Sequence, residues 1–281
     1  MTVGSDAHPD VAGSRGNRYS SLLGWVFDQN YELGSVHVEW HRDELAVGAA
    51  SLGIELPKNL GDVVYSARYR TTLPEGIVSR APAGTEWIIR GLGRAKYAFD
   101  AVPVQTRVVP SPSLVVTKIP DATPEMIRES ALGDEQALLA LVRYNRLIDT
   151  FLGISAYSLQ NHLRTTARGV GQVEVDEVYV AVDGHGVQYI LPVQAKGGTD
   201  EIGVTQAEQD LAVCAQKWPH LVARPIAAQF MPDGVIALFE LTVQDDQVRV
   251  LRESHYKLVP AVGISDEDRQ LYRRAASGAG S

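Results

Sequence analysis

The chain has little cysteine, no long apolar run and no excess of positive charge. Its single cysteine, Cys214, excludes an intramolecular disulfide framework and a cysteine-cluster zinc site, which is typical of proteins from a reducing cytoplasm. No apolar run approaches the roughly 18 residues that indicate a membrane span, and the N-terminal segment has no apolar signal core. We therefore expect a cytoplasmic protein that does not associate with a membrane.

What is present is ordinary globular composition. The 281 residues are 45% hydrophobic and 21% charged, which excludes a disordered, collagenous or coiled-coil protein. The formal net charge is -8, so any binding to nucleic acid has to come from a local basic surface rather than from the whole chain. The length suits one large domain or two smaller ones.

A proline cluster divides the chain into two parts. Four prolines between residues 110 and 124 disfavour helix and indicate a linker, which we place at residues 109–120. Residues 1–119 hold 12 basic and 12 acidic residues, so the second part carries the whole negative charge. Residues 1–18 and 263–281 are rich in small and polar residues, and we expect a disordered N-terminus and a flexible C-terminal tail.

The first part, residues 19–108, predicts a winged-helix-like α+β domain. Two helical segments, residues 41–54 and 59–70, are followed by two alternating runs at residues 85–91 and 94–102 that form a hairpin. Asn59 is placed to cap the second helix. Two helices and a two-stranded wing in this order are typical of winged-helix domains that bind double-stranded DNA. A small α+β domain with a solvated basic face is the alternative.

Basic residues concentrate in this part of the chain. Positions 58–96 hold seven basic residues against three acidic ones. Those placed to contact phosphates and base edges are Arg68 and Arg70 on the second helix, and Arg90, Arg94 and Lys96 on the wing.

The second part, residues 121–262, predicts an α/β domain with a mixed central sheet flanked by helices. Residues 135–153 have apolar positions at helical spacing and predict a helix, and residues 155–168 form a second amphipathic segment that predicts another helix. The remaining predicted elements are strands at 171–183 and 187–196, a helix at 205–218, and strands at 224–231, 235–243 and 248–259.

Two neighbouring strands carry the residues that indicate chemistry. Side chains alternate along a strand, so Glu174 and Asp176 share one face, as do Gln194 and Lys196. Pairing the strands through the turn between them brings Asp176 next to Gln194 and Lys196. A carboxylate beside a lysine suits metal-dependent phosphodiester hydrolysis, and Mg²⁺ fits because it binds through one or two carboxylates plus substrate phosphate.

The strand–turn–strand with Asp176 and Gln194-x-Lys196 resembles the catalytic core of the PD-(D/E)xK nuclease superfamily, over roughly residues 135–239. The resemblance implies a restriction-endonuclease-like core with Asp176, Gln194 and Lys196 as catalytic residues. Gln194 stands where an acidic residue is commoner, so a second metal carboxylate is expected elsewhere. The candidates are Glu174 and Glu135 for the metal, and Gln206, Gln209 and His162 as auxiliary residues. His162 has a packing or capping role as its alternative.

The sequence thus predicts a Mg²⁺-dependent, site-specific DNA endonuclease, of the type II restriction kind and with a possible dependence on base modification. Cutting both strands usually requires two active sites, so we expect a homodimer. A repair, junction or transposon-end nuclease is the closest alternative. A DNA-binding regulator with an inactive nuclease-like domain, and an enzyme acting on an unrelated substrate, are the others.

Overall fold

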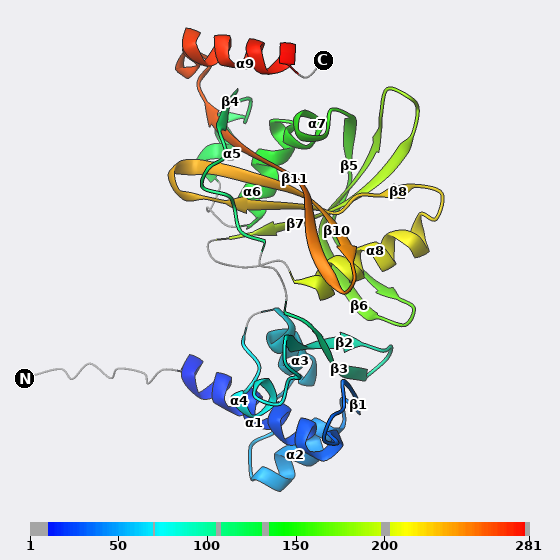
Figure 1. The fold of residues 1–281 in the computed structure, drawn as a ribbon. Coiled ribbons are helices and arrows are strands. Elements are labelled where there is room, and N and C mark those ends of the chain that lie inside the picture. Colours follow the sequence, from blue (N-terminus) through cyan, green and yellow to red (C-terminus); the bar gives the residue numbers. More distant parts are fainter. Residues whose placement is uncertain (1–10, 70, 105–107, 131–134, 198–202, 279–281) are drawn as a thin grey trace, which may run out of the picture. The chain divides into compact units, whose positions relative to one another are not determined.

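The computed structural model describes residues 11–69, 71–104, 108–130, 135–197 and 203–278. The chain divides into two compact units (Figure 1). Unit 1 comprises residues 1–105 with residues 168–171, and unit 2 comprises residues 106–167 and 172–281.

Unit 1 is built from helices and one small antiparallel sheet. Its described elements are α1 (Val11–Asn30), β1 (His37–His41), α2 (Glu44–Leu52), α3 (Leu60–Tyr69), α4 (Glu75–Val78), β2 (Thr85–Gly91) and β3 (Lys96–Pro103). In the described part of the unit, three strands pair antiparallel in the order β1-β3-β2, so the strand from between the first two helices joins the later hairpin.

The core of unit 1 is aromatic. Phe27 of α1 meets the rings of Trp87 and Phe99 edge-on, at centroid distances of 5.2 and 5.1 Å. Helices α1 and α2 approach so closely that a Cβ on Gly48 would lie 2.8 Å from the ring of Trp25. The glycine in the middle of α2, which weakens a helix locally, is therefore explained by packing.

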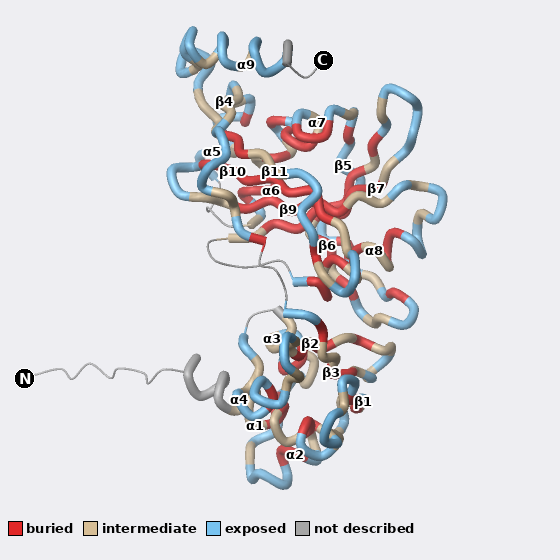
Figure 2. Tube along the Cα trace, viewed as in Figure 1, coloured by how far each residue is buried: buried red, intermediate tan, exposed pale blue. Residues whose placement is uncertain are grey.

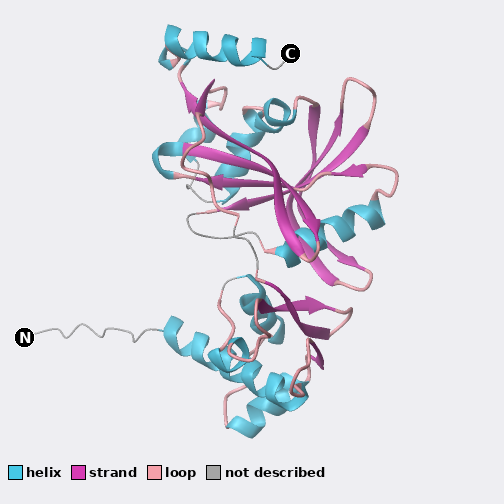
Figure 3. Cartoon of the chain, viewed as in Figure 1, coloured by secondary structure: helices cyan, strands magenta, loops and turns pink. Residues whose placement is uncertain are grey.

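Unit 2 is α/β, with a mixed sheet flanked by helices (Figure 3). Its elements before the long hairpins are β4 (Val116–Pro120), α5 (Glu125–Ser130), α6 (Glu135–Tyr144) and α7 (Leu147–Leu152). The three long strands that follow are β5 (Ser155–Ala167), β6 (Gly171–Val182) and β7 (Gln188–Lys196). The remaining elements are α8 (Val204–Lys217), β8 (Val222–Ala223), β9 (Ile226–Phe230), β10 (Val235–Gln244), β11 (Gln247–Val259) and α9 (Asp266–Gly278).

Eight strands among the described residues make one sheet, in the order β4-β11-β10-β9-β7-β6-β5, with β8 paired to β7. Helices α6 and α7 pack on one face, where Leu138 and Val142 join Val193 and Ala195 in the core. Helix α8 connects β7 to the parallel strand β9, and its Asp210 bonds to Gln194 of β7. Because neighbouring strand residues point to opposite faces, α8 covers the other face. Buried segments run along β7, β9 and β10, at the centre of the sheet (Figure 2).

The predicted helix at residues 155–168 is wrong, because this segment is the strand β5. The residues from Tyr157 to His162 are exposed. Neither the two-residue period of a half-buried strand nor the 3.6-residue period of a helix is therefore imposed on their sequence by burial. Pairing with β6 at the end of the sheet decides its conformation instead.

The predicted helix at residues 135–153 is present but broken into α6 and α7. Arg146 has a left-handed backbone, with φ of 49°, between the two helices. The preceding residue, Asn145, is buried and accepts a hydrogen bond from the Ala122 amide while donating to Thr123 Oγ1. A contact to a distant segment therefore interrupts a sequence pattern that is continuous for helix.

Three predicted irregular segments contain secondary structure. Residues 11–18 of the predicted disordered N-terminus belong to α1, and residues 1–10 lie outside the described residues. The predicted linker at 109–120 contains β4, which pairs parallel with β11, so unit 2 begins before residue 121.

The predicted flexible tail, residues 263–281, contains α9. This helix is held to β4, because Tyr272 accepts the Lys118 amide at 2.8 Å and Asp268 binds the Lys118 ammonium at 2.7 Å. Residues 279–281 lie outside the described part of the chain.

The other predicted elements are confirmed, and the structure adds the short elements α4 in unit 1 and α5 and β8 in unit 2. The two helical segments are α2 and α3, and Asn59 Oδ1 accepts the Gly61 amide at 3.0 Å at the start of α3. The hairpin is β2–β3. Sequence reasoning missed the strand β1 and most of helix α1. Within the described residues, no helix is long and apolar enough to cross a membrane.

Candidate active site

Asp176 of β6 is bound to β7 at the position between Gln194 and Lys196. Glu177, the next residue of β6, pairs with Val193, so Asp176 comes level with the end of β7. The Ala195 amide, between Gln194 and Lys196, donates to Asp176 Oδ2 at 2.9 Å. This hydrogen bond fixes the carboxylate at the junction of the two strands, as the sequence predicts.

The charges around Asp176 form a compact set. Burial raises the pKa of the Asp176 carboxyl, and the negative charge of Glu174 adds to the rise. The Ala195 amide, the Lys196 ammonium and His162 act in the opposite direction on that pKa. Asp176, Glu174, Lys196 and His162 are therefore close enough to interact, and a further cation at the site would be favoured by the two carboxylates.

Gln194 is buried, with 3% exposed area, and contacts a carboxyl group that sequence reasoning missed. Its Nε2 lies 3.1 and 3.0 Å from the two carboxyl oxygens of Asp210, which projects from α8. The pKa of Asp210 is raised to about 8, chiefly by burial and also by the charge of Asp176, while Gln194 and Lys196 oppose the rise. The sequence does hold a signal for this contact. Asp210 is spaced at helical intervals from Ala207 and Cys214, so it lies on the buried face of α8, where an unpaired aspartate is rare.

Glu174 is held by residues of β5. Arg164 binds Glu174 Oε1 at 3.1 Å, and His162 Nδ1 lies 3.7 Å from the same oxygen. His162 has a left-handed backbone, with φ of 48°, which is uncommon for a residue with a side chain. The structure thus brings Glu174 and His162 beside Asp176. Arg164, which stands near His162 on β5, joins this group through its contact with Glu174.

Of the other residues predicted for this site, Glu135 does not lie beside Asp176, whereas Gln206 and Gln209 lie on the same side of the sheet. Glu135 begins α6, which packs on the face of the sheet opposite to the one that carries Asp176. Gln209 is buried on α8 next to Asp210, and Gln206 is half-buried one turn earlier. Both glutamines are on the helix that covers the Asp176 face.

The predicted DNA-binding residues of unit 1 differ in their surroundings. Arg94 and Lys96 are exposed at the β2–β3 turn. Arg90 faces Asp100, with its Nη1 3.5 Å from Oδ2, and 23% of its side chain is exposed. Arg68 is half-buried on α3, and Arg70 lies outside the described residues.

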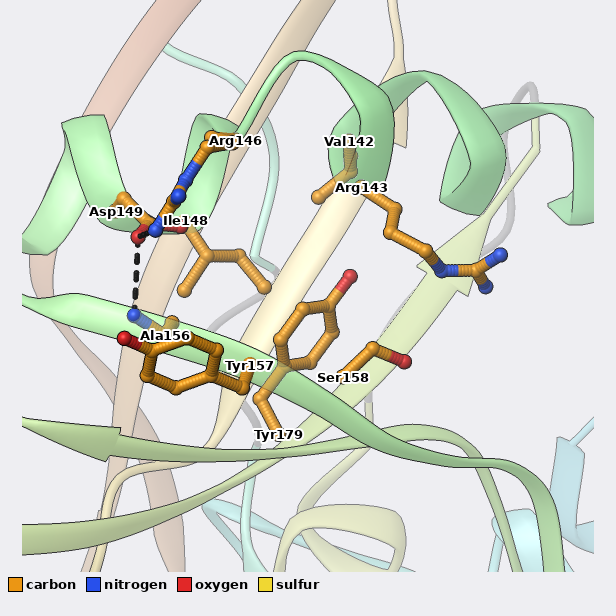
Figure 4. Close-up of a pocket in the computed structure, with 9 residues that line it drawn as sticks. All are labelled: Val142, Arg143, Arg146, Ile148, Asp149, Ala156, Tyr157, Ser158 and Tyr179. Atoms are coloured by element: carbon orange, nitrogen blue, oxygen red, sulfur yellow. Dashed lines mark hydrogen bonds and ion pairs between the residues drawn. The ribbon is translucent and has the colours of Figure 1, made fainter.

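The other face of β6 carries a second buried carboxylate. Glu177 has no exposed side-chain area, and its Oε1 accepts from Arg143 Nε at 2.7 Å and from Ser158 Oγ at 2.5 Å. A pocket of about 290 Å³ opens here, lined by Val142, Arg143, Arg146, Ile148, Asp149, Ala156, Tyr157, Ser158 and Tyr179 (Figure 4).

The charges of this pocket are balanced within it. Arg143 is paired with Glu177, and Arg146 with Asp149, whose carboxylate also accepts the Ala156 amide at 3.0 Å. Burial raises the pKa of the Tyr179 hydroxyl, so that side chain stays neutral. The pocket therefore offers no excess charge to an anionic substrate.

The Asp176 site suits a cation that takes only some of its ligands from the protein. Across the part of the chain that the structure describes, no three His, Cys, Asp or Glu side chains are grouped to hold a metal by themselves. Mg²⁺, however, binds proteins through one or two carboxylates and takes its other ligands from water and phosphate. Asp176 and Glu174, with Gln194 Oε1 buried and without a hydrogen-bond partner, fit such a set.

Comparison with protein-family models and with curated proteins finds no match to this sequence.

Proposed function

We propose that unit 2 is a Mg²⁺-dependent DNA endonuclease and that unit 1 binds double-stranded DNA. The observation that carries this proposal is the hydrogen bond from the Ala195 amide to Asp176 Oδ2. It holds a half-buried carboxylate beside the strand segment that presents Gln194 and Lys196, which is the juxtaposition that metal-dependent phosphodiester hydrolysis requires.

The chain topology around the site supports the resemblance to the PD-(D/E)xK core. Helices α6 and α7 precede the strands β5, β6 and β7, and α8 leads to β9, which pairs parallel with β7. The layout that the resemblance implies is a helix, a β-hairpin, a helix and a further strand, and α6, β6–β7, α8 and β9 follow this order. The strand β5, which lies between α7 and β6, is an addition to that layout.

The residues of the site have separable roles in the proposed reaction. Asp176 and Glu174 would hold the cation, and Gln194 would offer a neutral oxygen. The chemistry that Mg²⁺ would supply when bound is stabilisation of the negative charge on the phosphate and easier ionisation of water. The Lys196 ammonium donates hydrogen bonds to the attacking water and to a phosphate oxygen, and it orients the one against the other. The oxygen of the water adds to phosphorus and one P–O ester bond breaks; the water gives up a proton to solvent and the leaving oxygen takes one up from solvent, which yields a phosphate monoester and an alcohol.

His162 and Arg164 would meet the substrate next to the cation. Both side chains are at least half exposed and both point to Glu174, so they lie at the mouth of the site. A guanidinium that is exposed in this way can bind a neighbouring phosphate of the same strand.

The DNA-binding role of unit 1 is supported by its order of elements. The succession α1, β1, α2, α3, α4, β2 and β3, with the strands in the order β1-β3-β2, is compatible with a winged helix. In that arrangement α3 would enter the major groove and the β2–β3 turn, with Arg94 and Lys96, would contact the backbone.

The proposed assembly is a homodimer in the cytoplasm, since two sites are needed to cut both strands of a duplex. Restriction of foreign DNA, with or without dependence on base modification, is the role we favour. The closest alternative is a repair, junction or transposon-end nuclease.

Cleavage of plasmid DNA tests the proposal. Unmethylated and naturally modified plasmids are incubated with the protein and Mg²⁺, beside an EDTA control. We expect discrete bands that EDTA removes, and a difference between the plasmids would show that modification gates cleavage. A protein that binds both plasmids but cuts neither would be a regulator rather than a nuclease.

Lys196→Ala provides the matched test of mechanism. We expect it to abolish cleavage and to leave DNA binding nearly unchanged, while Lys217→Ala, at the exposed end of α8, changes neither. Full cleavage by the Lys196 variant would exclude the proposed mechanism.

A further inference from the structure

The two ends of the Gln194 side-chain amide have different surroundings. Nε2 lies 3.0 and 3.1 Å from the carboxyl oxygens of Asp210 and 3.4 Å from the backbone oxygen of Glu174. These contacts use the two hydrogens that the amide can donate. Oε1, the acceptor of the same amide, is buried and has no hydrogen-bond partner.

A buried carbonyl oxygen without a partner is costly, because it has given up its hydrogen bonds to water. Rotation of the amide by half a turn would not remove the cost, because Nε2 would then leave its acceptors on Asp210 and on the backbone of Glu174. An oxygen held in this way next to Asp176 and Lys196 is available to a donor or a cation that enters the site.

We propose that Asp210 is a positioning residue that holds the Gln194 amide with its nitrogen inward, so that Oε1 serves as a neutral ligand for the divalent cation. The proposal rests on the proposed function for the identity of the cation. Asp210 acts through Gln194 and does not itself touch the cation or the substrate.

The same contact explains why position 194 holds an amide. A carboxylate there would lie about 3 Å from the oxygens of Asp210, where the structure has Nε2, and both side chains are buried. Two carboxylates at that distance cannot both ionise without a strong rise in one pKa. With a glutamine, the buried acid on α8 becomes an acceptor that orients its neighbour instead of repelling it.

A double-mutant cycle on metal affinity tests the proposal. Binding of Mn²⁺ is measured by electron paramagnetic resonance in the full-length protein without DNA, for wild type, Asp210→Asn, Gln194→Met and the double variant. Asparagine can turn either end of its amide to Gln194, so the preference for one orientation is lost. We expect Asp210→Asn to weaken Mn²⁺ binding about tenfold, as is usual when the partner of a metal ligand is changed.

The double variant decides how Asp210 acts. If it acts through Gln194, Asp210→Asn has no further effect on Mn²⁺ affinity once Gln194 is replaced. An equal loss in both backgrounds would mean that Asp210 acts by its charge alone, and no loss would mean that it is structural; either result overturns the proposal. Asp233→Asn, which removes an exposed carboxylate of unit 2, is the control and should leave Mn²⁺ affinity unchanged.

A second measurement covers a Gln194 variant that does not fold. The side-chain amide ¹⁵N signals of Gln194 are followed in wild type and Asp210→Asn on addition of Mg²⁺. We expect a distinct shift in wild type that is reduced in the variant, and an unchanged signal in wild type would overturn the proposal. Plasmid cleavage is assayed in parallel. If the double-mutant cycle on Mn²⁺ affinity gives the expected result but no plasmid is cleaved, the proposed nuclease function is wrong and the positioning role of Asp210 stands.

Discussion

Asp176 and Glu177 are neighbours in sequence, and their side chains lie on opposite faces of β6 in contrasting environments. Glu177 is fully buried and paired with the Arg143 guanidinium and the Ser158 hydroxyl. Asp176 has the Ala195 amide as its hydrogen-bond donor, and its pKa is raised by burial and by Glu174. The Glu177 carboxylate is engaged by an arginine through Oε1, while its Oε2 is buried without a hydrogen-bond partner. The Asp176 carboxylate instead has a second carboxylate, Glu174, beside it. A carboxylate whose ionised form is disfavoured by burial and by a neighbouring like charge is typical of a functional site, and stability alone does not select it.

The largest expected effect is on the Asp176 face. Asp176→Asn keeps an acceptor for the Ala195 amide but removes the charge, so we expect cleavage to fall by about 10²–10⁴-fold. The free energy of unfolding at neutral pH should stay the same or rise, because the raised pKa shows that the ionised form is disfavoured in the fold. Plasmid cleavage rates and thermal unfolding measure the two effects. A variant that loses stability together with activity would remove the distinction between the two carboxylates.

The opposite face should respond in the opposite way. Arg143→Met leaves Glu177 as an unpaired buried carboxylate, and we expect the free energy of unfolding to fall by about 3–5 kcal/mol. Cleavage per folded molecule should be unchanged. Urea unfolding provides the measurement.

Arg146→Met is its control, since Arg146 is 60% exposed and its ion pair with Asp149 should contribute less than about 1 kcal/mol. If Arg143→Met instead impaired cleavage of fully folded protein, the pocket of Figure 4 would belong to the active site.

The pH dependence of stability sharpens the comparison further. The pKa of Asp210 is raised in the fold to about 8, so the native state holds a proton that the unfolded chain has released. Stability from this group is present at low pH and is lost as pH rises from about 4 towards 8, by at most about 1.4 kcal/mol per pH unit. Thermal unfolding between pH 5 and 9 should therefore show a decline.

The decline should be smaller in Asp210→Asn, which has no such proton to lose. The carboxyls of Asp121, Asp183 and Asp268, whose pKa values are lowered, stabilise the fold above their ordinary pKa and have done so fully by pH 5. An equal slope in wild type and variant would contradict the assignment to Asp210.

The smallest effect concerns the exposed cations of unit 1. Replacing Arg94 and Lys96 together by alanine should weaken DNA binding in all sequences alike and lower the slope of log affinity against log salt by about 2. The rate of cleavage at saturating DNA should not change, since neither residue belongs to either face of β6. Arg90→Ala is the comparison, and its effect should be less than half as large because Asp100 already neutralises it. Binding titrations at several salt concentrations distinguish these outcomes.

Sequence reasoning succeeded where the pattern was local and strongly periodic. The strands that carry Asp176 and Lys196, the helix at 204–217 and the β2–β3 hairpin follow from alternation, turn residues and capping. The pairing of Asp176 with residues 194–196 followed from a hairpin whose turn was visible in the sequence. Sequence reasoning failed to predict that β5 is a strand, because its exposed side chains show no period. It also failed to predict the break in the helix at Arg146, because that break depends on the contact of Asn145 with a segment more than twenty residues away.

The sequence by itself determined the class of fold, the hairpin at the centre of the site and the residues on the Asp176 face of β6. Only the tertiary structure decided which other groups join them. Asp210 meets Gln194 because α8 crosses over the sheet between β7 and β9, and His162 and Arg164 meet Glu174 because β5 is a strand. Strand alternation is a property of neighbouring residues and can be read along the chain. The approach of a helix to a sheet depends on how the whole core packs, which no single segment encodes.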